Sequence, residues 1–355
     1  MKIIANECNV WSADNVAADL AELLCGRDPR QTFLLVDEGS RQYCLPLLAS
    51  VPGIPADHVI TIPAGDDAKD YNSALLIWNF LSQHGATRKA LLVNLGGGMP
   101  CDLGGFCAAT FKRGIEFINI PTTLLSQVDA SLGGKTGMNL GSLKNEIGIF
   151  GMASHVLISG DFLRTLDKNN ILSGFAEMIK HGLIHKADAV PQLLSFDFDN
   201  VDYALLQRYV AESILVKNFF VLADPKEKGI RKALNFGHTF GHAFETFSMR
   251  SGRPILHGFA VAYGMVCELI LSRNKMGLAP DVANSLARQI LSLYGPLANV
   301  AGHEDELIEL MRHDKKNGAD GINFSLLPMV GDVVVNQIAS TDEILDVLNE
   351  FFAIR

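Results

Sequence analysis

Short apolar runs alternate with helical patterns over about the first 155 residues of the chain. Four of the runs predict buried strands, because each is almost continuously apolar and ends at glycine, proline or a turn-forming polar residue. They span residues 32–36, 58–62, 90–95 and 116–120. Residues 72–84, between two of them, carry apolar side chains at helical spacing. Strands and helices in this alternation indicate a parallel sheet covered on both faces.

The pattern changes after about residue 160, where helical periodicity replaces the strands. Residues 209–222 and 341–352 are predicted to be helices. The most apolar run, residues 255–271, contains His257 and Glu268 and is therefore predicted to be a buried core helix, not a membrane span. We expect an α/β domain over residues 1–158 and an all-α domain over residues 159–355.

Composition narrows the class of protein. A chain of 355 residues with 48% hydrophobic and 19% charged residues is expected to be globular and to form two domains. The net charge of −9 argues against nucleic-acid binding, which requires a basic surface. The first residues lack the apolar segment of a secretory signal, and the six cysteines form no CxxC pair. These features predict a cytoplasmic enzyme, with no membrane partner.

The stretch LNFGHTFGHAFE, residues 234–245, is the first candidate for chemistry. His238, His242 and Glu245 follow at spacings of four and three residues, which places them on one face of a helix. His257 lies shortly after them. Two imidazoles and a carboxylate suit zinc and leave a coordination position open for a substrate. Histidines that only fill a buried helix are the alternative, but three histidines and several glycines so close together favour a metal site.

A glycine-rich turn is the second candidate. Gly96, Gly97 and Gly98 follow a predicted strand and precede a predicted helix, an arrangement that lets the backbone approach a diphosphate. Cys101 stands where the usual fingerprint has glycine or alanine, so an ordinary glycine turn remains an alternative. Asp37, at the end of an earlier strand, could bind a ribose hydroxyl or cap a helix.

Two further features carry charge. The segment GGKT, residues 133–136, resembles the end of a P-loop but lacks the upstream glycine, which argues against a nucleotide triphosphatase. Glu177 and Lys180 lie three residues apart among apolar neighbours, so they are expected on one buried helix face. A metal bound to the glutamate would give this face a partner, and a surface ion pair is the alternative.

Taken together, these stretches resemble the 3-dehydroquinate synthase family over nearly the whole chain. The matching blocks are GGGMPCDLGGF, FKRG, PTTLLSQVDASLGGKTGMN, KNEIGIF, SGFAEMIKHGLI, GIRKALNFGHTFGHAFE, LHGFAVAYGM and DKKNG. The resemblance implies a Rossmann-like NAD-binding domain and a helical metal- and substrate-binding domain, with the active site in the cleft. Members of the family are commonly homodimers. The resemblance also implies NAD and a divalent metal, usually zinc with cobalt as the alternative.

The resemblance further implies a role for individual residues. The implied metal ligands are Glu177, His238 and His257, which replaces the set suggested by helical spacing. The implied substrate residues are Asp129, Lys135, Asn145, Lys180, Lys217, Arg231, Asn235, His242 and either Lys315 or Lys316, together with Arg113 from the neighbouring subunit. The implied NAD residues are Asp37, Asp66, Lys69, Gly97, Gly98, Asp102, Thr122, Thr123, Lys135 and Lys144. Asp66 replaces the family's usual glutamate, and Pro225 replaces an acidic residue.

The implied reaction converts 3-deoxy-D-arabino-heptulosonate 7-phosphate, a sugar-phosphate acid, into 3-dehydroquinate and phosphate, step two of the shikimate pathway. In this scheme NAD is reduced transiently, phosphate is eliminated, the hydride returns and an intramolecular aldol closes the ring. A sister sugar phosphate cyclase, of the inosose or valiolone synthase type, is the nearest alternative. A metal-dependent polyol dehydrogenase and a non-catalytic binding protein are more distant ones.

Overall fold

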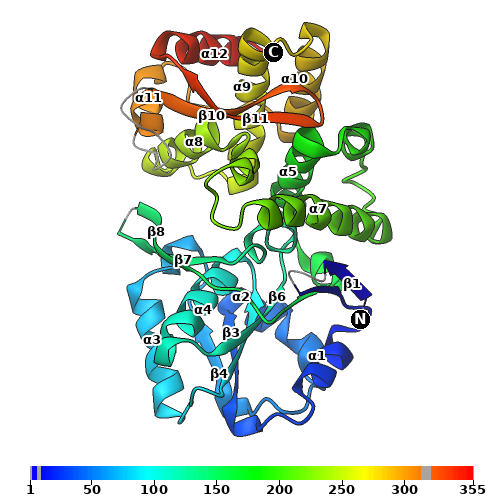
Figure 1. The fold of residues 1–355 in the computed structure, drawn as a ribbon, viewed down its shortest axis with the longest axis vertical. Coiled ribbons are helices and arrows are strands. Elements are labelled where there is room, and N and C mark those ends of the chain that lie inside the picture. Colours follow the sequence, from blue (N-terminus) through cyan, green and yellow to red (C-terminus); the bar gives the residue numbers. More distant parts are fainter. Residues whose placement is uncertain (1, 6–8, 142, 313–320, 355) are drawn as a thin grey trace. The chain divides into compact units, whose positions relative to one another are not determined.

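The computed structural model describes residues 2–5, 9–141, 143–312 and 321–354 (Figure 1). The chain forms two compact units, one made of residues 1–167 and 202–218 and the other of residues 168–201 and 219–355. The sequence predicts one boundary after residue 158. The observed division is discontinuous because the long helix α7 (Tyr203–Ala223) begins in the first unit and ends in the second.

The first unit is built on a seven-stranded sheet with the order β1-β2-β9-β6-β5-β3-β4. All neighbouring strands run parallel except β1, which is antiparallel to β2. The four strands predicted from apolar runs are confirmed as β3, β4, β5 and β6. The strands are β1 (Lys2–Ala5), β2 (Val10–Ser12), β3 (Thr32–Asp37), β4 (Val59–Ile62), β5 (Leu91–Gly96), β6 (Glu116–Pro121) and β9 (His155–Ile158).

Helices of the first unit bury apolar side chains against this sheet. Leu20 of α1 packs in one cluster with Val93 of β5 and Ile118 of β6, and all three are buried. Helix α4 approaches β5 closely, because a Cβ on Gly104 would lie 2.1 Å from Oδ1 of Asn94. The helices are α1 (Val16–Leu24), α2 (Glu38–Tyr43), α3 (Tyr71–Gln83), which confirms the helix predicted over residues 72–84, and α4 (Gly98–Thr110).

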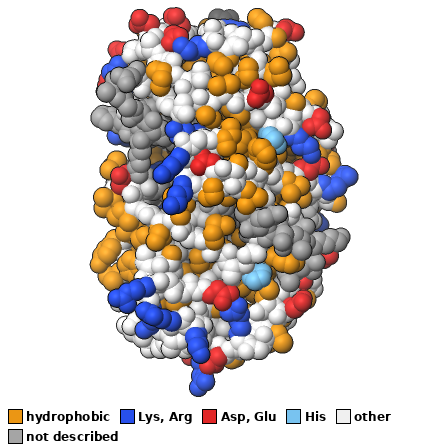
Figure 2. All heavy atoms as spheres, viewed as in Figure 1, with side chains coloured by type: hydrophobic (Ala, Val, Ile, Leu, Met, Phe, Trp, Pro, Cys, Tyr) orange, Lys and Arg blue, Asp and Glu red, His pale blue; other side chains and the backbone are white. Residues whose placement is uncertain are grey.

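A separate hairpin, which the sequence pattern does not predict, also belongs to the first unit. It consists of β7 (Lys135–Leu140) and β8 (Leu143–Phe150), paired antiparallel. Its strands approach each other through glycine, since a Cβ on Gly137 would lie 2.6 Å from the carbonyl oxygen of Ile147. Apolar side chains of the hairpin are exposed, and hydrophobic atoms gather at the left edge of the face drawn in Figure 2, where Figure 1 labels β8.

The second unit is mainly helical. Helix α9 is its centre, with an almost continuously buried run from Gly258 to Ser272, which confirms the core helix predicted over residues 255–271. It packs against α5, α8, α10, α12 and β10. The elements are α5 (Lys168–His185), α6 (Val190–Leu194), α8 (His238–Arg250), α9 (His257–Met276), α10 (Pro280–Tyr294), α11 (Glu304–Arg312), β10 (Ile322–Met329), β11 (Asp332–Ala339) and α12 (Thr341–Ala353).

The predicted fold class, an α/β domain followed by a helical domain, is confirmed. The β10–β11 hairpin is an exception to an all-α second unit: its strands are antiparallel, with β10 packed on α9 and β11 on α5. Within the described ranges, no helix has both the length and the apolar character that crossing a membrane demands.

Candidate active site

The carboxyl ends of β3, β5 and β6 lie side by side in the sheet. The chain runs from β3 outward to β4 and then returns across β3 to β5, so the boundary between β3 and β5 is a topological switch point. Ligands of doubly wound sheets bind at such a point. Five predicted NAD residues lie at these strand ends: Asp37 is the last residue of β3, Gly97 and Gly98 follow β5, and Thr122 and Thr123 follow β6.

The glycine turn forms the open N-terminus of α4. Gly97 is the N-cap residue, and no side chain among the described residues caps this helix. A Cβ on Gly97 would lie 3.2 Å from Cγ2 of Thr123, and one on Gly98 would lie 3.1 Å from Cβ of Ala130. Side chains at these positions would crowd Thr123 and Ala130, so this turn accommodates glycine best. Free N–H groups and the helix dipole make the turn a fit for the diphosphate of NAD.

Asp37 has a structural contact of its own. Its Oδ1 accepts a hydrogen bond from the backbone N–H of Ser40 at 2.6 Å, and its own N–H donates to Oγ of Ser40 at 2.9 Å. This reciprocal capping box begins α2. The helix-cap interpretation of Asp37 is therefore confirmed, while binding of a ribose hydroxyl stays a prediction.

Lys69 is the centre of a polar cluster beside α4. Its Nζ lies 2.6 Å from Oδ2 of Asp102 and 2.5 Å from Oδ1 of Asn145, and its side chain is 4% exposed. Burial raises the pKa of the Asp102 carboxyl, against the opposing effect of the Lys69 ammonium. Lys144 pairs with Asp66 at 3.0 Å. These contacts join the hairpin to α4 and to the turn after β4, so predicted cofactor residues and one predicted substrate residue, Asn145, lie in one network.

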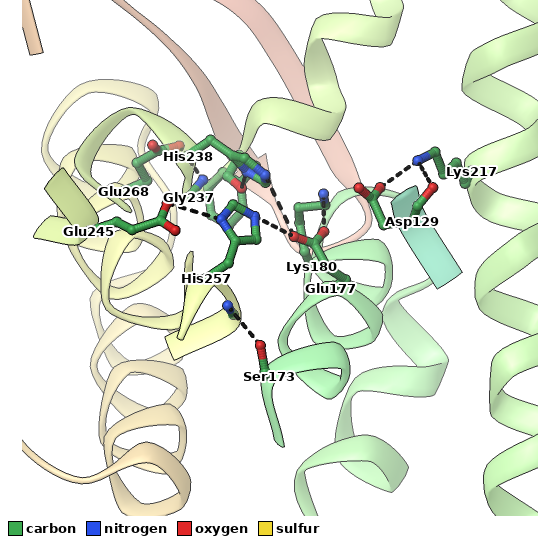
Figure 3. A network of polar contacts seen from close by, with 12 residues as sticks. Asp129, Ser173, Glu177, Lys180, Lys217, Gly237, His238, Glu245, His257 and Glu268 are labelled. Carbon is green, nitrogen blue, oxygen red and sulfur yellow. Dashed lines mark hydrogen bonds and ion pairs between the residues drawn. The ribbon is translucent and has the colours of Figure 1, made fainter. Parts of the chain in front are cut away.

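Four other predicted residues also lie in the first unit. Nζ of Lys217, a buried residue of α7, donates to Oδ1 of Asp129 at 2.6 Å (Figure 3). Lys135 begins β7 and is exposed. Arg113 is exposed too, with a φ of 69°, between Lys112 at 50° and Gly114 at 113°. Successive left-handed conformations at non-glycine residues are strained, a feature that concentrates at functional sites.

Three helices of the second unit bring Glu177, His238 and His257 together (Figure 3). Oε1 of Glu177 lies 3.6 Å from Nε2 of His238 and 3.7 Å from Nε2 of His257. Two donors on a tetrahedral zinc ion are about 3.4 Å apart, so this spacing suits one small cation. Glu177 is completely buried, and its Oε1 accepts no hydrogen bond from the described residues. A bound cation would supply the partner that a buried carboxylate needs, and the residues therefore fit a divalent metal.

The atom of each proposed ligand that faces away from the donor cluster also has a polar partner. Oε2 of Glu177 forms an ion pair with Lys180, which is 1% exposed. The predicted buried pair is thus confirmed, and the surface alternative is wrong. Nδ1 of His238 faces the carbonyl oxygen of Phe236 at 3.3 Å, and Nδ1 of His257 faces Oε2 of Glu245 at 3.2 Å.

Glycines allow the three helices to meet. A Cβ on Gly264 of α9 would lie 1.9 Å from the carbonyl oxygen of Gly237, the residue before His238. A Cβ on Gly258, the residue after His257, would lie 1.8 Å from the carbonyl oxygen of Ser173 on α5. Neither position can accept a side chain without moving a backbone. The glycines that accompany the histidines in the sequence therefore bring the ligand-bearing backbones into contact.

The ligand set suggested by helical spacing is not the one that the structure assembles. His242 and Glu245 stay outside the three-donor cluster. Spacing along α8 identifies residues that share a face, but it cannot show which neighbours α5 and α9 supply. Glu245 lies two turns beyond His238 and contacts His257 instead, while the His242 ring centroid lies 5.3 Å from that of His238.

Arg231 is held by a polar turn that sequence reasoning missed. It is 1% exposed, and its Nη1 donates to the carbonyl oxygen of Pro225 at 2.9 Å. Oδ2 of Asp224 accepts from the backbone N–H groups of Gly229 and Arg231. The hydrogen bond from Gly229 is the main cause that lowers the pKa of the Asp224 carboxyl. In the sequence Asp224 looks like an ordinary turn residue. Its position directly before Pro225 is the only signal for the hydrogen bonds that it accepts in this turn.

Asn235 has a defined partner as well. Its Nδ2 donates to Oε1 of Glu227 at 2.9 Å, and Glu227 has a positive φ of 55°. Glu227 stands at no characteristic spacing from Asn235, so the sequence alone does not predict it as the partner of Asn235. Lys315 and Lys316, the two alternatives for a late substrate lysine, lie outside the described residues.

Solved structures show which fold the chain adopts. It is similar to 2-epi-5-epi-valiolone synthase from Streptomyces hygroscopicus, solved with NAD⁺ and Zn²⁺, at 23% identity over 99% of this chain and 98% of that chain, with a TM-score of 0.81. A 2-deoxy-scyllo-inosose synthase, solved with carbaglucose-6-phosphate, NAD⁺ and Co²⁺, also matches at 23% identity over 96% of both chains, with a TM-score of 0.81. At this identity the matches show the fold alone, which the chain shares with both of these cyclases.

Sequence comparisons identify the family. Models of the 3-dehydroquinate synthase N-terminal and C-terminal regions match residues 59–173 and 174–317. A 3-dehydroquinate synthase from Parabacteroides distasonis is 47% identical over 344 residues, which cover 97% of this chain and 98% of the relative. The chain belongs to the 3-dehydroquinate synthase family, and the enzymatic function predicted from its sequence is confirmed.

Proposed function

We propose that the chain converts 3-deoxy-D-arabino-heptulosonate 7-phosphate into 3-dehydroquinate and phosphate with NAD at the β3–β5 edge and a divalent metal, zinc or cobalt, at Glu177, His238 and His257. The convergence of two imidazole nitrogens, Nε2 of His238 and Nε2 of His257, on the buried Oε1 of Glu177 is the observation that carries the proposal. When bound, the metal would polarise substrate hydroxyls and NAD would accept a hydride that is returned within the same turnover.

Buried cations support an anionic substrate. The chain has a net charge of −9, yet Lys180 and Arg231 are each 1% exposed and Lys217 is 5% exposed. Lys180 and Lys217 pair with Glu177 and Asp129, and Arg231 donates to the carbonyl oxygen of Pro225. The carboxylate and the phosphate of the substrate would offer these cations further charged acceptors. We assign these cations to substrate binding and orientation, together with Asp129, Lys135, Asn145, Asn235 and His242.

We assign NAD binding to residues of the first unit. Gly97 and Gly98 would hold the diphosphate through their backbone N–H groups. Lys69, Asp102, Lys144 and Asp66 would fix the turn and the hairpin around the cofactor through their ion pairs. Asp37, Thr122 and Thr123 complete the proposed set at the strand ends.

A homodimer is proposed from two surface features. Leu140, Leu143 and Phe150 of the hairpin and Met152 just after it are each 53–56% exposed, and large exposed apolar surface of this kind marks an interaction site. Arg113 stands exposed in a strained backbone conformation, which suits a side chain that reaches a neighbouring subunit's site.

A cytoplasmic location is also proposed. The five described cysteines are free thiols, as expected in a reducing compartment. Burial raises the pKa of Cys101 and Cys267 well above the usual range, so these thiols are unreactive.

Product analysis tests the proposed reaction. The purified protein would be incubated with 3-deoxy-D-arabino-heptulosonate 7-phosphate, catalytic NAD and zinc. We expect dehydroquinate and phosphate in equal amounts and no net NADH. If protein that is shown to hold metal and NAD forms neither product, the proposal is rejected. Turnover of a hexose or heptulose phosphate would then identify a sister cyclase.

A further inference from the structure

Glu245 contacts the imidazole of His257 on the side remote from Glu177 (Figure 3). Its carboxylate is nearly buried, with 11% of the side chain exposed, and its Oε2 lies 3.2 Å from Nδ1 of His257. The Nε2 atom of the same ring faces Oε1 of Glu177. An acceptor at Nδ1 requires that the ring proton be there, which leaves the lone pair of Nε2 for a cation.

The two histidines of the centre have unlike partners. Nδ1 of His238 faces a neutral carbonyl oxygen, that of Phe236, and its side chain is 11% exposed. The side chain of His257 is 29% exposed and begins α9, so its packing constrains it less. A carboxylate at Nδ1 both orients such a ring and raises the basicity of its other nitrogen. The more exposed ligand thus receives the stronger partner.

We infer that Glu245 is a positioning residue of the metal centre: it holds His257 with Nδ1 protonated and Nε2 aimed at the cation, without binding the cation itself. The inference rests on the proposed metal site. It also explains why Glu245, seven residues after His238, shares a helix face with the centre and yet lies outside the donor cluster.

A purely structural role is the rival explanation. A pair that only joins α8 to α9 would contribute to the stability of the metal-free protein and would leave the metal affinity of folded protein unchanged. A positioning role changes both the affinity and the coordination geometry. The decisive measurements must therefore report on the metal directly.

Full-length metal-free protein would be titrated with zinc against a chromophoric chelator, and the visible absorption of cobalt-substituted protein would be recorded. We expect Glu245→Ala to weaken zinc affinity by about 10–100-fold and to alter the cobalt spectrum. Glu245→Gln should lie between wild type and Glu245→Ala and keep the wild-type cobalt spectrum, because its amide oxygen accepts the same hydrogen bond without charge. Glu306→Gln is the matched control, since Glu306 is exposed and lies 3.9 Å from Nδ1 of His303.

Each outcome decides between the explanations. Wild-type affinity and spectrum in folded Glu245→Ala would overturn the inference and leave the metal site intact. If Glu245→Ala fails to fold by circular dichroism, Glu245→Asp replaces it, because the shorter side chain keeps the charge but withdraws the oxygen from Nδ1. Wild-type affinity in that variant would also overturn the inference. If wild type binds no zinc, or His257→Ala binds it normally, the proposed metal site fails and the inference falls with it.

Discussion

Glu177 uses its two carboxylate oxygens differently. Oε2 pairs with Lys180, whereas Oε1 faces two imidazole nitrogens at 3.6 and 3.7 Å. One buried carboxylate can therefore serve a fixed cation and an exchangeable one, and the fixed cation keeps part of its charge compensated when no metal is bound. The centre depends on each donor, because a metal with three protein ligands loses a third of its protein coordination when one is removed.

His257→Ala should remove both metal and turnover. We expect substoichiometric zinc in the purified variant and a rate reduced by about 10³-fold or more, since polarisation of the substrate by the metal is worth several kcal/mol. Metal content and product formation check this. His303→Ala, which changes an exposed histidine of the same unit, is the control and should match wild type. Equimolar zinc with normal turnover in His257→Ala would rule out the assigned centre.

The Arg27–Glu116 ion pair on the surface of the first unit is expected to make the free energy of unfolding depend on pH. Arg27 donates two hydrogen bonds to the Glu116 carboxylate, at 2.9 and 2.7 Å, and these bonds lower the pKa of Glu116 below 4.5. A lowered carboxyl pKa stabilises the fold above the unfolded-state value, and the contribution disappears as pH falls through the folded-state pKa. The pair is partly exposed, so its worth is below about 1 kcal/mol.

Arg27→Met should therefore lower the urea midpoint at about pH 7, and this effect should shrink as the pH is lowered to about 3, because the stabilisation is lost as pH falls through the lowered pKa of Glu116. Urea unfolding of wild type, Arg27→Met, Glu116→Gln and the double variant gives the coupling free energy at each pH. A coupling that is unchanged between these two pH values would show that Glu116 is not the titrating group.

At the scale of elements, the crossing of α8 and α9 is fixed by glycine. Gly264→Ala would place Cβ 1.9 Å from the carbonyl oxygen of Gly237. We expect roughly 1–3 kcal/mol of destabilisation or more, because a backbone must move, and weaker zinc binding because His238 moves with it. Urea unfolding and zinc titration measure the two effects. Gly39→Ala in α2, with its nearest atom at 3.4 Å, should be neutral or slightly stabilising. Wild-type stability in Gly264→Ala would contradict this packing.

Strands and long helices could be predicted from the sequence because their burial pattern is local. The run at residues 90–95 becomes β5, with every residue buried, and the apolar run around His257 becomes α9. The β7–β8 hairpin could not be predicted, since its strands expose apolar residues and pair through Gly137 and Gly148, which resemble a loop in sequence. The same limit applies to the metal centre, whose donors come from three helices and whose spacing along any one helix is misleading.

At the scale of the whole molecule, Arg113 and Lys217 differ in how their own chain holds them. Lys217 is 5% exposed and bonded to Asp129 of its own unit. Arg113 is exposed, in a segment whose three residues 112–114 all have positive φ. A strained and exposed arginine fits a side chain that completes a second copy's site, which is the arrangement of a symmetric dimer with shared sites.

Mixing Arg113→Ala with Lys217→Ala subunits tests that arrangement. If Arg113 acts across the dimer, each heterodimer has one site with both defects and one site with neither. Random exchange of equal amounts makes half of the dimers heterodimers, so about a quarter of wild-type activity should return. Activity of differently tagged, co-purified heterodimers measures the rescue. Lys112→Ala, which alters the exposed and equally strained neighbour, should keep near-wild-type activity. Verified heterodimers no more active than the two parents would place Arg113 in its own subunit's function, and the apolar hairpin would then need another partner.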